Sequence, residues 1–121
     1  MRLAICGGSQ SETRYLCTKL QEYCAQAGCP AEVCPFEGLG ELWAAFRPGL
    51  FGGVLMGVGD TAGFLAARRI REQDRDCRLV IVDDTPRYAI HCLRIHAADF
   101  LLRPVEEEQL QRSFRRLVGR E

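Results

Sequence analysis

Short apolar runs alternate with longer amphipathic segments along the whole chain, and this alternation restricts the fold more than any other feature of the sequence. Strict alternation of strand and helix predicts parallel strands whose crossover helices cover both faces of one sheet. Five strands and five helices in 121 residues predict a single α/β domain over residues 1–121, a three-layer sandwich with the flavodoxin-like strand order 2-1-3-4-5. The expected strands are residues 2–6, 31–35, 52–58, 78–82 and 99–102.

The helices are expected between Ser9 and Gly28 and over residues 41–46, 61–72, 87–95 and 106–118. Ser9 stands three residues before Glu12, which is the spacing of a capping box at a helix start. Helical periodicity assigns an inward face to each later helix. The side chains expected to point inward are Phe64, Leu65, Ala67, Ile90, Leu93, Leu110, Phe114 and Leu117, with Arg68, Arg69 and Arg71 pointing outward.

The charge balance excludes one broad class of function. Sixteen basic and sixteen acidic residues give a net charge of zero, whereas a chain that wraps nucleic acid needs a strong basic excess. No apolar run approaches the roughly 18 residues of a membrane span, and the apolar stretch at the start of the chain is too short for the apolar region of a signal peptide. We therefore expect a cytoplasmic protein with no membrane contact.

Seven cysteines are many for this length, but their number is odd and no C-x-x-C pair occurs. A zinc site would show closer pairs. We expect reduced, mostly buried thiols and neither a metal nor another cofactor.

In a parallel α/β sheet, function sits just beyond the carboxyl ends of the strands. The residues at these positions are Gly7, Gly8, Gly57, Asp83, Asp84 and Arg103. The adjacent glycines Gly7 and Gly8 could cradle a phosphate between strand and helix, although the chain has neither a G-x-G-x-x-G nor a G-K-[ST] motif. A plain tight turn explains the pair equally well. Cys6, just before this turn, would be the candidate residue of a thiol redox enzyme of flavodoxin-like fold.

The last third of the chain resembles a response-regulator receiver (CheY-like) domain of the subtype that precedes LytTR DNA-binding domains. The similar segment is RYAIHCLRIHAADFLLRPVEEEQLQRSFRRL, residues 87–117. It contains the Tyr-Ala helix of the subtype and a close counterpart of its His-Ala-x-Asp-[FY]-Leu-Leu-Lys-Pro strand. The segments RLAIC and FLAARRIRE also resemble parts of the family. The resemblance implies a CheY-like fold, a role in two-component signalling and a cis peptide bond before Pro104.

The departures from the family pattern fall on the residues of the phosphorylation chemistry. The acidic pair that holds Mg²⁺ in receivers is replaced by Gly7 and Gly8. The phosphoacceptor Asp is replaced by Gly57, or by Leu55 if the loop is counted without a gap. The Ser/Thr after the fourth strand is replaced by Asp83, and the Lys before Pro by Arg103.

Phosphoryl transfer to a receiver needs a carboxylate nucleophile and a cation held by carboxylate oxygens. Glycines supply neither, so we expect a degenerate receiver that does not take up a phosphoryl group and has no enzymatic activity. Arg103 carries less weight, because fifteen of the sixteen basic residues are Arg and only Lys19 is Lys.

Asp83 and Arg103 follow neighbouring strands, and we expect either an ion pair that occupies the old phosphate site or two solvated charges. Asp60 in the preceding loop is a weak substitute for the lost acid. His91 and His96 are expected to be packing residues rather than metal ligands.

The expected function is a phosphorylation-independent regulatory and dimerisation module, the N-terminal part of a LytTR-type transcription regulator. DNA contact would then belong to a domain beyond Glu121. The alternative is a small-molecule sensor that binds a ligand in the emptied phosphorylation site. The face on which related receivers dimerise would carry Arg87, Arg94, Glu107, Arg112, Arg115 and Arg116, charges that suit a partner protein and a solvated surface equally.

Overall fold

The computed structural model describes residues 1–120, which form five strands and five helices in strict alternation. The strands are β1 (Arg2–Cys6), β2 (Glu32–Pro35), β3 (Gly53–Met56), β4 (Arg78–Asp83) and β5 (Asp99–Leu102). The helices are α1 (Gln10–Ala27), α2 (Leu39–Ala45), α3 (Asp60–Gln73), α4 (Ala89–Arg94) and α5 (Glu107–Leu117). Within residues 1–120, none of the helices has the length and apolar character to cross a membrane.

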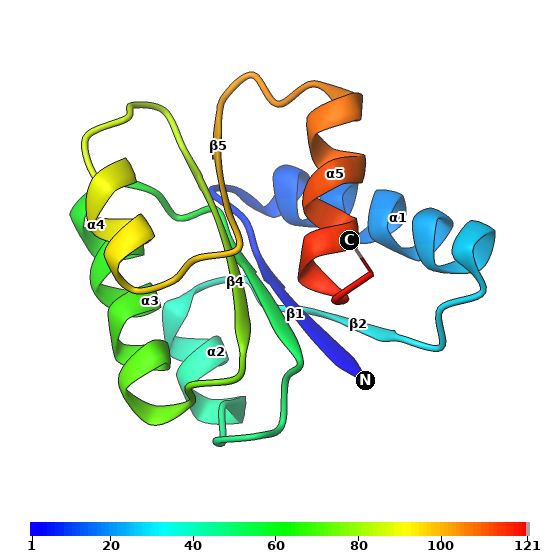
Figure 1. Ribbon diagram of the computed structural model, residues 1–121, viewed down its shortest axis with the longest axis horizontal. Helices are drawn as coiled ribbons and strands as arrows, with labels where there is room; N and C mark the ends of the chain where they lie inside the picture. Colours follow the sequence, from blue (N-terminus) through cyan, green and yellow to red (C-terminus); the bar gives the residue numbers. More distant parts are fainter. Residues whose placement is uncertain (121) are drawn as a thin grey trace.

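All strands run parallel in the order β2-β1-β3-β4-β5, the order expected from the sequence. The register pairs Cys6 with Met56 and Asp83 with Leu102. The carboxyl ends of the strands therefore meet at one edge of the sheet, the upper edge in Figure 1. The loops that leave this edge carry the candidate site.

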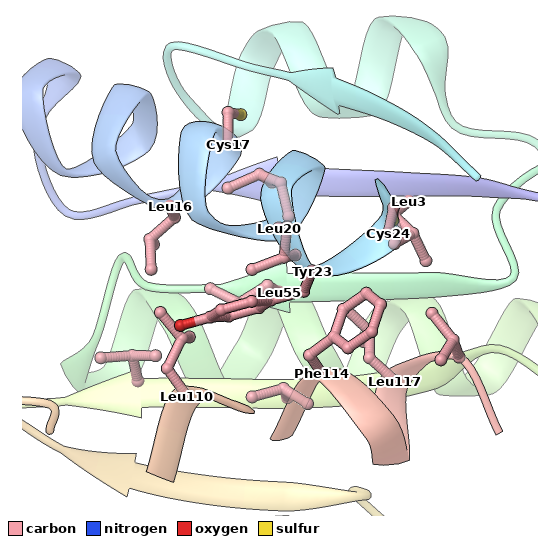
Figure 2. Close-up of a cluster of buried hydrophobic side chains, with 14 of the residues drawn as sticks. Leu3, Leu16, Cys17, Leu20, Tyr23, Cys24, Leu55, Leu110, Phe114 and Leu117 are labelled. Atoms are coloured by element: carbon pink, nitrogen blue, oxygen red, sulfur yellow. The ribbon is translucent and has the colours of Figure 1, made fainter. Parts of the chain in front are cut away.

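The pleat of the strands divides the core into two layers. In β1, Leu3 and Ile5 face α1 and α5, whereas Ala4 and Cys6 face α2, α3 and α4. Figure 1 shows the same division, with α1 and α5 on one side of the sheet and the other three helices opposite. Figure 2 shows the first layer, in which side chains of α1 and α5 pack over Leu55 of β3. Sheets covered on both faces in this way need the continuous apolar runs seen in the sequence.

The ends of α1 follow from local sequence. The Ser9 hydroxyl accepts the backbone N–H of Glu12 at 3.1 Å, as an N-cap does. Gly28 adopts a left-handed conformation with φ 62° and ends the helix. Along the helix, Leu16, Leu20 and Cys24 are buried, as their four-residue spacing predicts.

The expected helix faces are correct for α5, wrong in part for α3 and wrong for α4. Leu110, Phe114 and Leu117 are buried, but Leu65 is 44% exposed, Ile90 64% and Leu93 70%. The six-residue α4 is instead anchored by Cys92, which is completely buried. Arg71, expected to point into solvent, donates from its guanidinium to main-chain carbonyls that include those of Ile95 and Asp74.

Candidate functional site

The residues expected at the strand ends lie together at the carboxyl edge of the sheet. Gly7 and Gly8 follow β1, Gly57 follows β3, and Arg103 follows β5. Leu55 lies within β3 and is 1% exposed in the core, whereas Gly57 is the residue that directly follows the strand. The Arg103–Pro104 peptide bond is cis.

Arg103 reaches from the end of β5 across the ends of β4 and β3 to α1. Its Nε and Nη2 atoms donate to the two carboxylate oxygens of Glu12, both at 2.7 Å. Nη2 also donates to the backbone carbonyl of Gly57, and Nη1 to Asp84 Oδ1 at 3.3 Å. A forked guanidinium can satisfy a carboxylate with two parallel bonds in this way, whereas an ammonium cannot.

Glu12, the other half of this ion pair, is itself held in place by a backbone N–H group. Its Oε1 atom accepts the backbone N–H of Gly8 at 2.7 Å, in addition to the bond from Arg103. The side chains of Arg103 and Glu12 are only 22% and 23% exposed. The bonds from Arg103 and Gly8 lower the pKa of the Glu12 carboxyl, although partial burial opposes them.

The glycines at the strand ends make room for this ion pair. A Cβ atom on Gly8 would lie 2.8 Å from Arg103 Nη2 and 2.9 Å from the carbonyl oxygen of Gly57. A Cβ atom on Gly57 would lie 2.8 Å from Glu12 Oε1. Any side chain at Gly8 or Gly57 would therefore displace Arg103 or Glu12 from its present position.

Asp83 and Arg103 form neither the ion pair nor the two solvated charges expected from the sequence, because each has other partners. Asp83 is 4% exposed, and its carboxylate accepts the backbone N–H groups of Asp60 at 2.9 Å and Asp84 at 2.7 Å. The first of these bonds places a negative charge at the N-terminal end of α3, where the helix dipole favours it. Asp83 thus organises the loop after β3, and Arg103 is neutralised by Glu12.

A shallow groove of about 400 Å³ runs beside the ion pair, between α1 and the segment after β5. Tyr15, Leu16, Val82, Pro104 and Val105 give it a largely apolar lining, with Glu12 and Arg103 at one end. The Cys6 thiol is fully buried, and burial raises its pKa, so it offers no accessible nucleophile.

The charged residues expected on the interaction face differ in their contacts: some form ion pairs within the chain, and others are exposed. Arg112 and Arg116 bind the nearly buried carboxylate of Asp99, Arg112 at 3.0 Å and Arg116 at 3.3 Å, and thereby fix α5 to β5. Arg87 lies 3.5 Å from Asp60, and Glu107 lies 3.0 Å from Lys19. Arg94 and Arg115 are exposed.

His91 contacts the rings of Phe64 and Tyr88, with centroids 5.5 and 5.6 Å apart. His96 is exposed. Within residues 1–120, no group of three or more His, Cys, Asp or Glu side chains is arranged to hold a metal ion.

Glu12 is the central residue that the sequence did not point out as part of the site. Its spacing from Ser9 indicated a capping box, and the Ser9 half of that box is present. The Glu12 side chain accepts from Gly8 rather than from Ser9, and this shift turns its second oxygen toward Arg103. The contact spans 91 residues of sequence, and local spacing carries no signal for it.

No protein-family profile and no curated protein matches the chain. Solved structures of receiver domains do match its fold. A CheY-like receiver domain protein from Methanospirillum hungatei superposes with a TM-score of 0.79 at 15% identity, over 98% of this chain and 93% of that one. The non-phosphorylated HemR receiver domain from Leptospira biflexa gives 0.77 at 19% identity, over 96% and 93%.

The response regulator TrrA from Thermotoga maritima, solved in complex with Mg²⁺ and BeF, gives a TM-score of 0.76 at 17% identity, over 96% of this chain and 97% of that one. At such identities the likeness establishes the CheY-like fold. The residues of this chain do not fit Mg²⁺ at the equivalent edge. Both oxygens of Glu12 bind Arg103, and Asp83 accepts two backbone N–H groups. Mg²⁺ needs carboxylate oxygens free to complete an octahedron.

Replacing Glu12 by Gln tests the energetic weight of the ion pair. Glu12→Gln removes the charge but keeps the size of the side chain, and we expect a loss of about 1–2 kcal/mol in the free energy of unfolding at pH 7. Because the pKa of Glu12 is lowered in the folded state, its stabilisation is complete above the unfolded value of about 4.3 and is lost as the pH falls through the folded value. Urea denaturation from pH 7 to pH 3 should show the two proteins converging at the acid end.

The matched control is Glu22→Gln on the same helix, where the carboxylate is exposed and lies 3.9 Å from Lys19. It should change the free energy of unfolding by less than about 0.5 kcal/mol. Equal effects of the two substitutions would contradict a special role for Glu12.

Proposed function

We propose that this chain is a receiver-like regulatory domain of two-component signalling that acts without phosphorylation. The observation that carries the proposal is the ion pair between Arg103 and Glu12, which fills the carboxyl edge of the sheet between Gly8 and Gly57. In this account the domain is cytoplasmic and regulatory rather than enzymatic.

The chemistry of phosphoryl transfer supports this proposal. A receiver needs a carboxylate nucleophile beside a cation that neutralises the phosphoryl oxygens. Here Gly57 follows β3, and Gly7 and Gly8 follow β1, so no carboxylate stands at these two strand ends. Glu12 is the nearest acid to Gly57 among these contacts, and Arg103 binds both of its oxygens.

The ion pair replaces a switchable group by a permanent one. In a domain that is phosphorylated, charge at this edge changes with the signal. Here a guanidinium and a carboxylate from the chain itself neutralise each other, and the same bonds tie β5 to α1. The domain would therefore hold one conformation, and regulation would come from binding a partner rather than from a covalent change.

The lineage that fits best is that of LytTR-type transcription regulators. The resemblance over residues 87–117 supports it, and it would make this chain the N-terminal part of such a regulator. Contact with DNA would then belong to a domain that follows Glu121, which agrees with the zero net charge of this chain.

The edge formed by α4, β5 and α5 is the surface we propose for contact with a second copy. β5 is the last strand of the sheet, with α4 on one side and α5 on the other (Figure 1). Ile90, Leu93 and Leu102 are exposed there by 64%, 70% and 42%. Exposed Arg94 on α4 and exposed Glu108 on α5 give the edge both charges, and a twofold contact pairs opposite charges from the two copies.

The alternative function, a small-molecule sensor, is favoured by one feature, the groove beside the ion pair. A ligand in the phosphorylation site itself would have to displace Arg103. The apolar groove of about 400 Å³ offers a place for a ligand whose polar end meets Glu12 or Arg103. Thermal-shift titration with FMN, ATP and c-di-GMP would reveal such binding as a rise in melting temperature.

Treatment with acetyl phosphate or beryllofluoride in the presence of Mg²⁺ tests the central part of the proposal. We expect no gain of a phosphoryl group by intact mass and no change in melting temperature, because glycines and not carboxylates follow β1 and β3. TrrA, which has been solved with Mg²⁺ and BeF, is the positive control.

Gly57→Asp should also remain unmodified, because Gly7 and Gly8 after β1 still supply no carboxylate to hold Mg²⁺ beside the new Asp. A phosphoryl group on the wild-type chain would refute the proposal.

Sedimentation of charged variants tests the second-copy contact. The double substitution Ile90→Glu and Leu93→Glu should convert a wild-type dimer to a monomer, because it places charges at the centre of the apolar patch. Leu65→Glu, at an exposed apolar position on α3, is the matched control and should remain dimeric. A wild-type chain that is monomeric at high concentration would exclude this contact.

A further inference from the structure

Two cysteines come together where α1 ends. Gly28 is left-handed, the backbone N–H of Cys29 donates to the carbonyl of Cys24 at 2.9 Å, and that of Gly28 donates to Ala25 at 3.3 Å. These two bonds define a Schellman motif, in which the side chains of the first and sixth residues commonly contact each other. In this chain those residues are Cys24 and Cys29, whose thiols lie close enough for Cys29 to raise the pKa of Cys24.

The surroundings of the two thiols differ. Cys24 is 6% exposed within the core layer of α1 and α5, and Figure 2 shows it beside Leu3. Cys29 is half-buried and packs against the same layer from its edge. Burial raises the pKa of Cys24, and the adjacent Cys29 thiol raises it further. Cys29 is therefore the thiol that a small reagent meets first.

A positive charge lies beside this pair. The Arg120 guanidinium donates to the carbonyl of Ala27 at 2.7 Å, at the last residue of α1. Its charge opposes the rise in the pKa of Cys24 and so favours the thiolate form. The cation therefore offsets part of the effect that burial has on the Cys24 thiol.

We propose that Cys24 and Cys29 form a reversible disulfide, a redox modification site that small-molecule disulfides such as glutathione disulfide oxidise. A disulfide requires neighbouring Cβ atoms, and the Schellman motif already brings these two side chains together. Closing the bond therefore needs side-chain rotation and no change of the backbone hydrogen bonds at Cys29 and Gly28.

The reaction balances as two successive exchanges. The Cys29 thiolate attacks one sulfur of glutathione disulfide, forms a mixed disulfide and releases one glutathione thiolate. Cys24 then gives up its proton, and its sulfur attacks the Cys29 sulfur and releases the second glutathione. The two cysteines lose two electrons and two protons, and one glutathione disulfide becomes two molecules of glutathione.

The other thiols lack this combination of contact and access. Cys77 and Cys92 are buried, and burial raises their pKa values to about 12 and about 11. Cys17 is buried with a pKa raised to about 11, and the half-buried Cys34 near it belongs to β2 and shares no turn motif with it. Cys34 is thus the matched control, since it is half-buried like Cys29.

Mass mapping after oxidation tests the proposal on the intact chain. The protein is incubated with excess glutathione disulfide, its free thiols are blocked with N-ethylmaleimide, and it is digested with trypsin and glutamyl endopeptidase. Fragment 23–32 contains Cys24 and Cys29 and no other cysteine. We expect this fragment to be lighter by two hydrogen atoms and unlabelled, and to take two labels after treatment with dithiothreitol.

Two variants and one comparison make the test specific. Cys34→Ser should oxidise at fragment 23–32 as the wild type does, and Cys29→Ser should lose the reaction completely. The equilibrium constant for forming the Cys24–Cys29 disulfide with glutathione disulfide should be at least about tenfold larger in the folded chain than in urea, because the motif holds the two thiols together. Any of four results would overturn the proposal. They are two labels on fragment 23–32 of the oxidised wild type, a persistent glutathione adduct at Cys29, a cross-link to another cysteine, and equal equilibrium constants in the folded chain and in urea.

Discussion

The ion pair between Arg103 and Glu12 is the contact on which the carboxyl edge of this domain depends. It joins the last strand to the first helix across the ends of the strands between them. The backbone N–H of Gly8 and the carbonyl of Gly57 bind the same two side chains, so the loops after β1 and β3 follow the position of the pair. The glycines at these loops are needed because the space of a Cβ atom is already occupied. The strand ends that carry glycine in the sequence are, in the structure, filled by the side chains of Arg103 and Glu12.

The order of strands and helices could be predicted from the sequence because each element has its own period and its own end signals. Alternation of faces in β1 and the capping residues Ser9 and Gly28 are local properties. The contents of the site could be predicted only in part. The topology brings the strand ends together, and so it identifies Gly8, Gly57, Asp83 and Arg103. It does not say which charges pair, because Asp83 turns toward the backbone of α3 while Arg103 extends to α1.

The error on α4 has a physical cause. This helix has only six residues and lies beside the edge strand, so a short apolar stripe does not settle which face is buried. Cys92 fills the core there, and Ile90 and Leu93 are left on the surface. Helical periodicity predicts an outward position for Arg71, and Arg112 is expected on the interaction face. Both instead bind carbonyl or carboxylate oxygens and hold neighbouring segments together. In this chain arginine acts as a structural connector at several places, and its fork of donors suits that role.

The most direct test of this account is a double-mutant cycle between Glu12 and Arg103. The free energies of unfolding of the wild type, Glu12→Gln, Arg103→Gln and the double variant give the coupling between the two side chains without the contributions that each makes alone. If the ion pair is the element that fills the site, the coupling energy should be about 1–3 kcal/mol at pH 7. A coupling energy indistinguishable from zero would mean that the two side chains meet without holding the edge together, and it would contradict the account.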